Sequence, residues 1–191
     1  MSTKIIVEAS ARHIHVTQET LEELFGKGHT LTIKKELSQP GQYACDEKVT
    51  AIGPRGKIER ISILGPVRPV NQLEVSLTDA IGSGVTIPVK LSGELIGTSP
   101  VVITGPAGQV SLSEGLIVAK RHIHCATTEA AKLGLKNGAM ATVRVESVRP
   151  TVFENVAVRV EDDYKFCLHL DTDEGNAAGI NKIGQGILLT K

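Results

Sequence analysis

The sequence predicts a mainly β protein made of small barrels, and three observations indicate this fold class. Short segments in which apolar and polar residues alternate recur along the chain, among them residues 58–64, 141–148 and 156–160. Turn signals rich in glycine and proline separate them, as at Gly53-Pro54-Arg55-Gly56. No long amphipathic helix and no low-complexity linker interrupts the series. Strands of this length and spacing favour small barrels over an α/β sheet.

A chain of 191 residues can form one domain or two small domains packed together. Hydrophobic residues make up 41% of the chain, which is enough for a buried core, but aromatic residues make up only 3% and tryptophan is absent. We therefore expect a core of Val, Ile, Leu and Ala side chains. The 21 basic and 21 acidic residues balance, so no electrostatic footprint for a nucleic acid or a membrane surface stands out.

The three cysteines, Cys45, Cys125 and Cys167, are odd in number and lack a paired spacing. This argues against a disulfide framework and for a reducing compartment. The residues Met1-Ser2-Thr3-Lys4 run directly into an apolar strand, without a signal peptide, and no run is long enough to span a bilayer. The sequence therefore predicts a cytoplasmic protein.

The first predicted elements belong to an internal repeat. An apolar strand leads into Arg12-His13-Ile14-His15, and a second one leads into Arg121-His122-Ile123-His124, at a separation of 122 − 13 = 109 residues. The two strands span residues 4–9 and 115–119. A helix-like stretch follows each tetrapeptide, over residues 17–25 and 127–133. Each stretch starts with a threonine N-cap, carries a glutamate in its first turn and finishes near a glycine.

The two tetrapeptides hold four of the six histidines of the chain. Side chains two positions apart on a strand point to the same side, because strand side chains alternate. Each His-x-His pair therefore forms a pincer for one metal ion, with the isoleucine turned the other way. Two pincers suggest a two-metal site. Zinc is the first candidate, because imidazole suits it and it needs no redox partner.

A second correspondence joins segment 72–79 to segment 167–174. When Leu73 is aligned with Leu168, Glu74 falls on His169, at a spacing of 169 − 74 = 95 residues. The apolar residues alternate in both segments, so Glu74 and His169 point away from the apolar faces. The alternating residues are Leu73, Val75 and Leu77 in one segment and Phe166, Leu168 and Leu170 in the other. Glu74 and His169 are thus candidates for a fifth and a sixth ligand on the polar side of a barrel wall.

Each candidate ligand also has an ordinary structural explanation. A single buried histidine is usually a hydrogen-bonded core residue, and Glu74 by itself resembles a solvated strand residue. The matched contexts favour metal binding for the two pincers, for Glu74 and for His169. His29 lies in a glycine-rich turn and is expected at the surface. The three cysteines are expected to be structural or incidental, although Cys167 shares the face of His169 and is a weaker candidate for a metal ligand.

Arg68 follows Leu64-Gly65-Pro66-Val67 and stands six residues before Glu74. An arginine at a boundary between loop and strand is commonly just exposed. Beside a metal site, however, its planar fork suits bidentate binding of a phosphate. The polar segment 38–42 also has two interpretations. It is either only a turn or a turn that presents backbone amides to a ligand.

The chain resembles the PduL-type phosphate propanoyltransferases, which are zinc-dependent phosphotransacylases best known from bacterial microcompartments for 1,2-propanediol breakdown. The similarity covers essentially the whole chain, and its motifs are specific as a set although each alone would be weak. These motifs are Ser10-Ala11-Arg12-His13-Ile14-His15, Leu37-Ser38-Gln39-Pro40-Gly41-Gln42, Leu64-Gly65-Pro66-Val67-Arg68, Glu74-Val75-Ser76-Leu77-Thr78-Asp79, Ala119-Lys120-Arg121-His122-Ile123-His124 and His169-Leu170-Asp171-Thr172-Asp173-Glu174.

The resemblance implies two small β-barrels capped by short α-helices, with the N-terminal strand completing the C-terminal barrel. One barrel domain would comprise residues 1–11 together with 120–191, and the other would comprise residues 12–119. The metal site would lie at the interface of the two domains.

The resemblance also implies a dinuclear zinc site, with two Zn2+ ions per chain. The implied zinc ligands are His13, His15, Glu74, His122, His124 and His169. Arg68 would be the catalytic residue that holds phosphate. Coenzyme A would lie along Ser10, Ala11 and Arg12 and reach Asn176. Further polar residues of the pocket would be Gln39, Gln42, Gln72, Ser92 and Arg159.

The implied activity transfers a short-chain acyl group, propanoyl or acetyl, between coenzyme A and inorganic phosphate. The small-molecule partners would be acyl-CoA and acyl phosphate, with no nucleic acid and no membrane. Microcompartment members of the family carry an N-terminal amphipathic extension for encapsulation, which is missing here, so a cytoplasmic location is expected and microcompartment association stays open. A homo-oligomer is compatible with the sequence.

Two other functions fit the same residues. A dinuclear zinc hydrolase would use metal-bound hydroxide on a thioester or a phosphoester, and phosphate-dependent release of coenzyme A separates it from a transferase. A non-catalytic barrel module would hold its metals as structural ions. Structural zinc sites are closed, whereas catalytic ones keep an open position. Six ligands shared by two metals leave positions open, which favours catalysis.

Overall fold

The computed structural model describes residues 3–189. The packing of the Cα atoms divides the chain into two compact units. Residues 1–11 and 120–191 form the first, here named the terminal unit, and residues 12–119 form the second, the central unit. Within the described residues both units are built mainly from strands, as predicted, and no helix is long and apolar enough to span a membrane.

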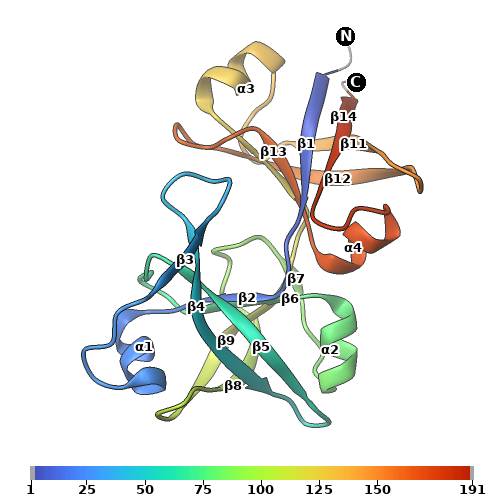
Figure 1. Ribbon diagram of the computed structural model, residues 1–191. Coiled ribbons are helices and arrows are strands. Elements are labelled where there is room, and N and C mark those ends of the chain that lie inside the picture. The colour runs from blue at the N-terminus through green and yellow to red at the C-terminus, as the bar shows by residue number, and fades with distance from the viewer. Residues whose placement is uncertain (1–2, 190–191) are drawn as a thin grey trace. The chain divides into compact units, whose positions relative to one another are not determined.

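The terminal unit contains a closed barrel of six strands in the order β1-β13-β10-β12-β11-β14, in which β14 pairs with β1 again. Figure 1 shows β1, in blue, beside β14, in red. The prediction that the N-terminal strand completes the C-terminal barrel is confirmed. The strands are β1 (Thr3–Ala9), β10 (His122–Cys125), β11 (Met140–Glu146), β12 (Thr151–Val160), β13 (Cys167–Leu170) and β14 (Ile183–Leu189), and the helices are α3 (Thr127–Leu133) and α4 (Thr172–Ala177).

The central unit contains a sheet in the order β3-β4-β5-β2-β6-β9-β7, and β8 pairs with both β4 and β9. The strands β4-β5-β2-β6-β9-β8 therefore close into a second six-stranded barrel. The strands are β2 (His13–His15), β3 (Ile33–Glu36), β4 (Tyr43–Ile52), β5 (Lys57–Gly65), β6 (Gln72–Val75), β7 (Val89–Lys90), β8 (Ser99–Thr104) and β9 (Gln109–Ala119), and the helices are α1 (Gln18–Phe25) and α2 (Leu77–Ser83).

The two barrels share one pattern of strand pairing. The first His-x-His strand, β2, is parallel to β5 and antiparallel to β6, and the second, β10, is parallel to β12 and antiparallel to β13. One further strand completes each barrel. It is β9 in the central barrel, where it is parallel to β6, and β1 in the terminal barrel, where it is parallel to β13. Along the chain, β1 precedes β2 and β9 precedes β10. Each completing strand therefore runs directly into the His-x-His strand of the other unit.

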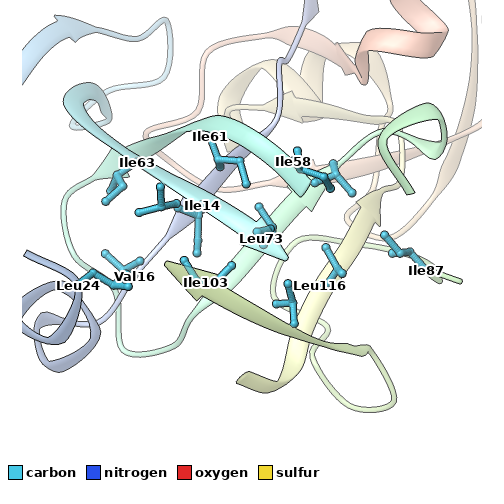
Figure 2. Close-up of a cluster of buried hydrophobic side chains, with 14 of the residues drawn as sticks. Ile14, Val16, Leu24, Ile58, Ile61, Ile63, Leu73, Ile87, Ile103 and Leu116 are labelled. Atoms are coloured by element: carbon cyan, nitrogen blue, oxygen red, sulfur yellow. The ribbon is translucent and has the colours of Figure 1, made fainter. Parts of the chain in front are cut away.

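Each barrel has its own apolar core of mainly Val, Ile and Leu side chains. In the central unit Ile14 and Leu73 are fully buried, and Figure 2 shows both among the side chains of this core. Ile123 and Leu168 are fully buried at the matching positions of the terminal unit. Full burial of such a side chain contributes about 1.5–3 kcal/mol. Because side chains alternate along a strand, burying these residues turns the flanking histidines away from the core.

Of the two predicted N-caps, one is confirmed and the other is wrong. Thr17 is the N-cap of α1, and its hydroxyl oxygen accepts a hydrogen bond from the Thr20 amide at 3.1 Å. The prediction that Thr127 caps α3 is wrong, because Thr127 is the first helical residue and Ala126 is the N-cap. The hydroxyl of Thr127 donates instead to Asp162. A threonine fits the sequence pattern both as an N-cap and as the first residue of a helix, so the pattern alone does not locate the cap.

The predicted strand over residues 72–79 is shorter than expected. It ends at Val75, and Ser76 caps α2 in a capping box with Asp79. Leu77, which we expected to continue the apolar face of the strand, is the first residue of α2 and is 48% exposed. The alternation of Leu73, Val75 and Leu77 runs past the true end of the strand, because the capping box outweighs it there.

Candidate metal centres

Three predicted ligands meet on the central barrel, on the side of β2 and β6 that faces away from its core. His13 and His15 lie on β2, Glu74 lies on β6, and one ligand atom of each lies within 4.8 Å of the others. The antiparallel register places His13 opposite Glu74, with 3.5 Å between His13 Nε2 and Glu74 Oε2. All three residues are buried. We refer to His13, His15 and Glu74 as the central set.

Hydrogen bonds orient two residues of the central set. Nδ1 of His15 lies 3.2 Å from the carbonyl oxygen of Leu64. Donation to that oxygen places the ring proton on Nδ1 and leaves Nε2 for a metal ion. The side-chain amide of Gln72 donates to Glu74 Oε1 at 2.6 Å, and its oxygen accepts from the Gly93 amide at 2.7 Å. Gln72 is therefore held by the Gly93 amide and in turn orients the carboxylate of Glu74.

The environment keeps the imidazole of His15 neutral. Burial, followed by the neighbouring His13 and the positive charge of Arg68, lowers the pKa of His15 from 6.5 to about 3. Arg68 is half-buried in the segment between β5 and β6, and its backbone amide donates to the Val16 carbonyl at 2.9 Å. Arg68, the residue predicted to bind phosphate, thus lies close enough to the central set to act on His15 electrostatically. A neutral imidazole is the form that binds metals.

The lowered pKa of His15 makes the metal-free protein sensitive to acid. The folded state keeps His15 neutral between about pH 3 and 6.5, whereas the unfolded chain protonates it over that range. Unfolding then takes up a proton, so the free energy of unfolding should fall as the pH drops below 6.5, by at most about 1.4 kcal/mol per pH unit. Urea denaturation in the presence of a chelator at several pH values measures this slope. The variant His15→Gln should show a smaller slope, and an unchanged slope would contradict the assignment.

The imidazole rings of the other three predicted ligands are neighbours on the terminal barrel. His122 and His124 lie on β10 and His169 lies on β13, opposite His122 in the antiparallel register. The ring centroids of His122 and His124 are 4.7 Å apart, and that of His169 lies 5.3 Å from the first and 4.7 Å from the second. Nδ1 of His122 lies 2.8 Å from the carbonyl oxygen of Lys120, which leaves Nε2 for a metal ion. We refer to His122, His124 and His169 as the terminal set.

Three residues that the sequence analysis did not select lie against the terminal set. Sγ of Cys167 is 2.9 Å from His169 Nε2. A carboxylate oxygen of Glu8 lies within 4.8 Å of ligand atoms of both residues. The ring of Tyr164 stacks on His124, with 4.1 Å between centroids. Cys167 could have been selected because it stands two residues before His169 on one strand face. Glu8 could not, because only the pairing of β1 with β13 brings it there.

The arginine of each tetrapeptide pairs with a carboxylate at the same position of a helix. Arg12 donates to Asp79 at 2.7 Å, and Arg121 donates to Glu174 at 2.6 Å. Asp79 is the third residue of α2 and Glu174 is the third residue of α4. Burial raises the pKa of Glu174, and the hydrogen bond from Arg121 acts in the opposite direction. Each pair ties the start of a His-x-His strand to the helix that follows Glu74 or His169.

The residues predicted to bind coenzyme A occupy several structural roles. Ser10 donates its amide hydrogen to the Leu170 carbonyl at 2.8 Å and accepts at its own carbonyl from the Thr172 hydroxyl at 3.3 Å. Thr172 begins α4, which also carries the exposed Asn176. Ala11 and Arg12 are exposed. The role of these residues in coenzyme A binding stays a prediction.

Other residues of the sequence analysis are placed as follows. Gln39 is buried and its carbonyl accepts from the Gln42 amide at 3.3 Å. The Ser92 hydroxyl accepts from Gln72 at 2.8 Å. Arg159 lies opposite His124 in the parallel register, and its guanidinium carbon is 5.9 Å from the Tyr164 ring centroid.

His29 lies partly at the surface, as expected, but it has partners that the sequence did not reveal. Its side chain is only 32% exposed, with Nε2 3.0 Å from Glu47 Oε1. The ring also stacks on Phe25, at 5.0 Å between centroids. The glycine-rich turn around His29 gave no indication of this contact, because Glu47 lies 18 residues further along the chain.

Comparisons with known proteins support the family that the motifs indicate. A family model for phosphate propanoyltransferase matches residues 6–181. A phosphate propanoyltransferase of Clostridioides difficile is 47% identical over 178 residues, which cover 93% of this chain and 85% of the relative. The one from Lachnoclostridium phytofermentans is 49% identical over 91% of this chain and 82% of its own length, and that of Listeria monocytogenes is 41% identical over 100% and 90%. The chain therefore belongs to the phosphate propanoyltransferase family and is an acyltransferase that uses phosphate.

Proposed function

We propose that this enzyme transfers a propanoyl or acetyl group between coenzyme A and inorganic phosphate, with one zinc ion bound at each of the two ligand sets. Phosphate acyltransferase activity follows from the family. One observation supports the metal part of the proposal. Each His-x-His strand has a third ligand at the same register position, Glu74 opposite His13 and His169 opposite His122.

The donor atoms of both sets fit zinc. Imidazole nitrogen and carboxylate oxygen are common zinc ligands in proteins. The backbone carbonyls of Leu64 and Lys120 accept from His15 and His122, so the opposite ring nitrogen of each can bind the ion. Gln72 orients the carboxylate of Glu74 in the same way. Such outer hydrogen bonds are typical of metal ligands and less expected of ordinary strand residues.

The proposed reaction breaks the carbon–sulfur bond of an acyl-CoA and forms a bond between the acyl carbon and a phosphate oxygen. When bound, zinc would supply a Lewis acid for the thioester carbonyl and for the departing thiolate. Arg68 would bind phosphate through two parallel N–H donors and offset its charge. The attacking oxygen is already anionic near neutral pH, so no general base is required. Because phosphate attacks the thioester directly, no covalent acyl-enzyme is required either.

The contribution of Arg68 would lie mainly in positioning. Holding phosphate beside the bound thioester makes the attack effectively intramolecular, which can lower a barrier by about 7–11 kcal/mol. Coenzyme A would be bound along Ser10, Ala11 and Arg12 and contacted by Asn176. The Asp79 carboxylate holds the guanidinium of Arg12, whose side chain is still 40% exposed.

The decisive experiment measures release of coenzyme A from acetyl-, propanoyl- and butanoyl-CoA on protein of known zinc content. Release should require phosphate, fall after metal removal and return when zinc is restored. Full activity in metal-stripped protein would refute the zinc proposal. Release that does not depend on phosphate would instead favour a dinuclear zinc hydrolase.

A further inference from the structure

The two ligand sets differ at one position of the repeat. Gln72 lies opposite His15 in the central barrel, and Cys167 lies opposite His124 in the terminal barrel. The Gln72 amide is fully engaged, because it contacts Glu74, Ser92 and Gly93. Cys167 instead carries a sulfur atom, which as a thiolate is a preferred zinc ligand.

The surroundings of Cys167 are those of a metal ligand. Its side chain is buried, with 3% of the residue exposed, and Sγ lies 2.9 Å from His169 Nε2. Glu8 places a carboxylate oxygen within 4.8 Å of ligand atoms of both residues. Glu8 lies opposite His169, whereas Ile117 lies opposite Glu74 at the matching position of the central barrel. Both the sulfur and the nearby negative charge are therefore features of the terminal barrel only.

We infer that Cys167 is the fourth ligand of the metal ion in the terminal set. This inference rests on the proposed function, because it assigns a further donor to one of the two proposed zinc ions. Binding of the ion displaces the thiol proton of Cys167 into solvent, and the thiolate sulfur bonds to the metal. The terminal set then supplies three imidazoles and one thiolate, while the central set supplies two imidazoles and one carboxylate.

The difference in donors predicts different behaviour of the two ions. A zinc ion with four protein ligands occupies a closed site, whereas one with three keeps a position for water or substrate. The thiolate and the Glu8 carboxylate also add negative charge beside the terminal ion. The terminal ion should therefore be held more tightly, and a chelator should remove the central ion first.

Cobalt substitution tests the inference directly. Full-length protein free of coenzyme A is loaded with Co2+, so that no thiol other than a cysteine can reach the metal. A charge-transfer band from thiolate to cobalt is expected in the near ultraviolet. The band should disappear in Cys167→Ala and Cys167→Ser. It should persist in Cys125→Ala, because Cys125 belongs to the apolar core and follows His124 on the other face of β10.

Competition with a chelator provides a second measurement. Wild-type protein should release its two ions in two steps. Cys167→Ser should weaken the tighter ion by at least about tenfold, since even outer-shell changes weaken metal sites about 10–100-fold. The looser ion should be unaffected. An unchanged melting temperature of the metal-free variant separates loss of a ligand from loss of the fold.

The outcomes distinguish this inference from the proposed function. Two bound ions without a thiolate band in the wild type, or with a band that survives in Cys167→Ala, would refute the role of Cys167 and leave the proposed function intact. Protein that binds no metal would overturn both. A band lost only in the Cys167 variants supports the inference whatever the acyl preference of the enzyme.

Discussion

The variant His15→Ala is expected to lose the zinc ion of the central set and to lower the rate of acyl transfer by roughly 10³-fold, which corresponds to about 4 kcal/mol in the barrier. The central set offers only three donors, His13, His15 and Glu74. With one imidazole removed, a histidine and a carboxylate remain, too few to hold the ion in place. Elemental analysis gives the zinc content, and steady-state kinetics with propanoyl-CoA and phosphate gives the rate.

His29 provides the matched control for this prediction. It lies in the same unit, but its ring nitrogen pairs with Glu47 and its ring stacks on Phe25. His29→Ala should keep both zinc ions and nearly full activity, with some loss of stability because Glu47 is left buried beside Thr32. If His15→Ala retained two ions and full activity, the central set would not be a catalytic metal site.

Local periodicity explains why much of the fold and of the arrangement of the candidate ligands was predictable. Strand side chains alternate, so the two imidazoles of each tetrapeptide had to share a face once Ile14 and Ile123 were buried. The same rule aligned Leu73 with Leu168 and so placed Glu74 and His169 at equivalent positions. The register confirms this, because they lie opposite His13 and His122. The family resemblance supplied the swapped N-terminal strand, which periodicity alone does not give.

The features that the sequence did not reveal depend on contacts between distant residues. Arg12 and Asp79 are 67 residues apart, and Arg121 and Glu174 are 53 apart. Glu8 reaches His169 only because β1 joins a barrel whose other strands begin after residue 120. Cys167 was not selected as a metal ligand for another reason. One cysteine near one histidine in the sequence is weak evidence for a metal site until the fold shows which other donors surround it. The cap of α3 was assigned to Thr127 instead of Ala126, and the start of α2 after Ser76 was missed, because capping depends on backbone geometry that alternation does not encode.

The variant Arg68→Ala is expected to raise the Michaelis constant for phosphate strongly and to lower kcat/KM for phosphate by about 10²–10³-fold, the range for losing one preorganised donor of charge stabilisation. Arg68 is the only predicted site residue whose role is to hold phosphate, and its charge acts on His15 in the central set. The Michaelis constant for propanoyl-CoA should change little. Arg68→Lys should restore only part of the loss, because an ammonium keeps the charge but lacks the planar fork.

Zinc content decides whether Arg68 acts on phosphate or on the metal ligands. Removing the guanidinium removes one of the causes that lower the pKa of His15, but burial, the largest cause, remains. His15 therefore stays neutral near pH 7, and Arg68→Ala should keep both ions. Arg60→Ala, which removes the same charge from an exposed position of β5, should leave the phosphate dependence unchanged. Loss of zinc in Arg68→Ala, or an equal rise of the Michaelis constant in Arg60→Ala, would show that general electrostatics and not bidentate binding governs the use of phosphate.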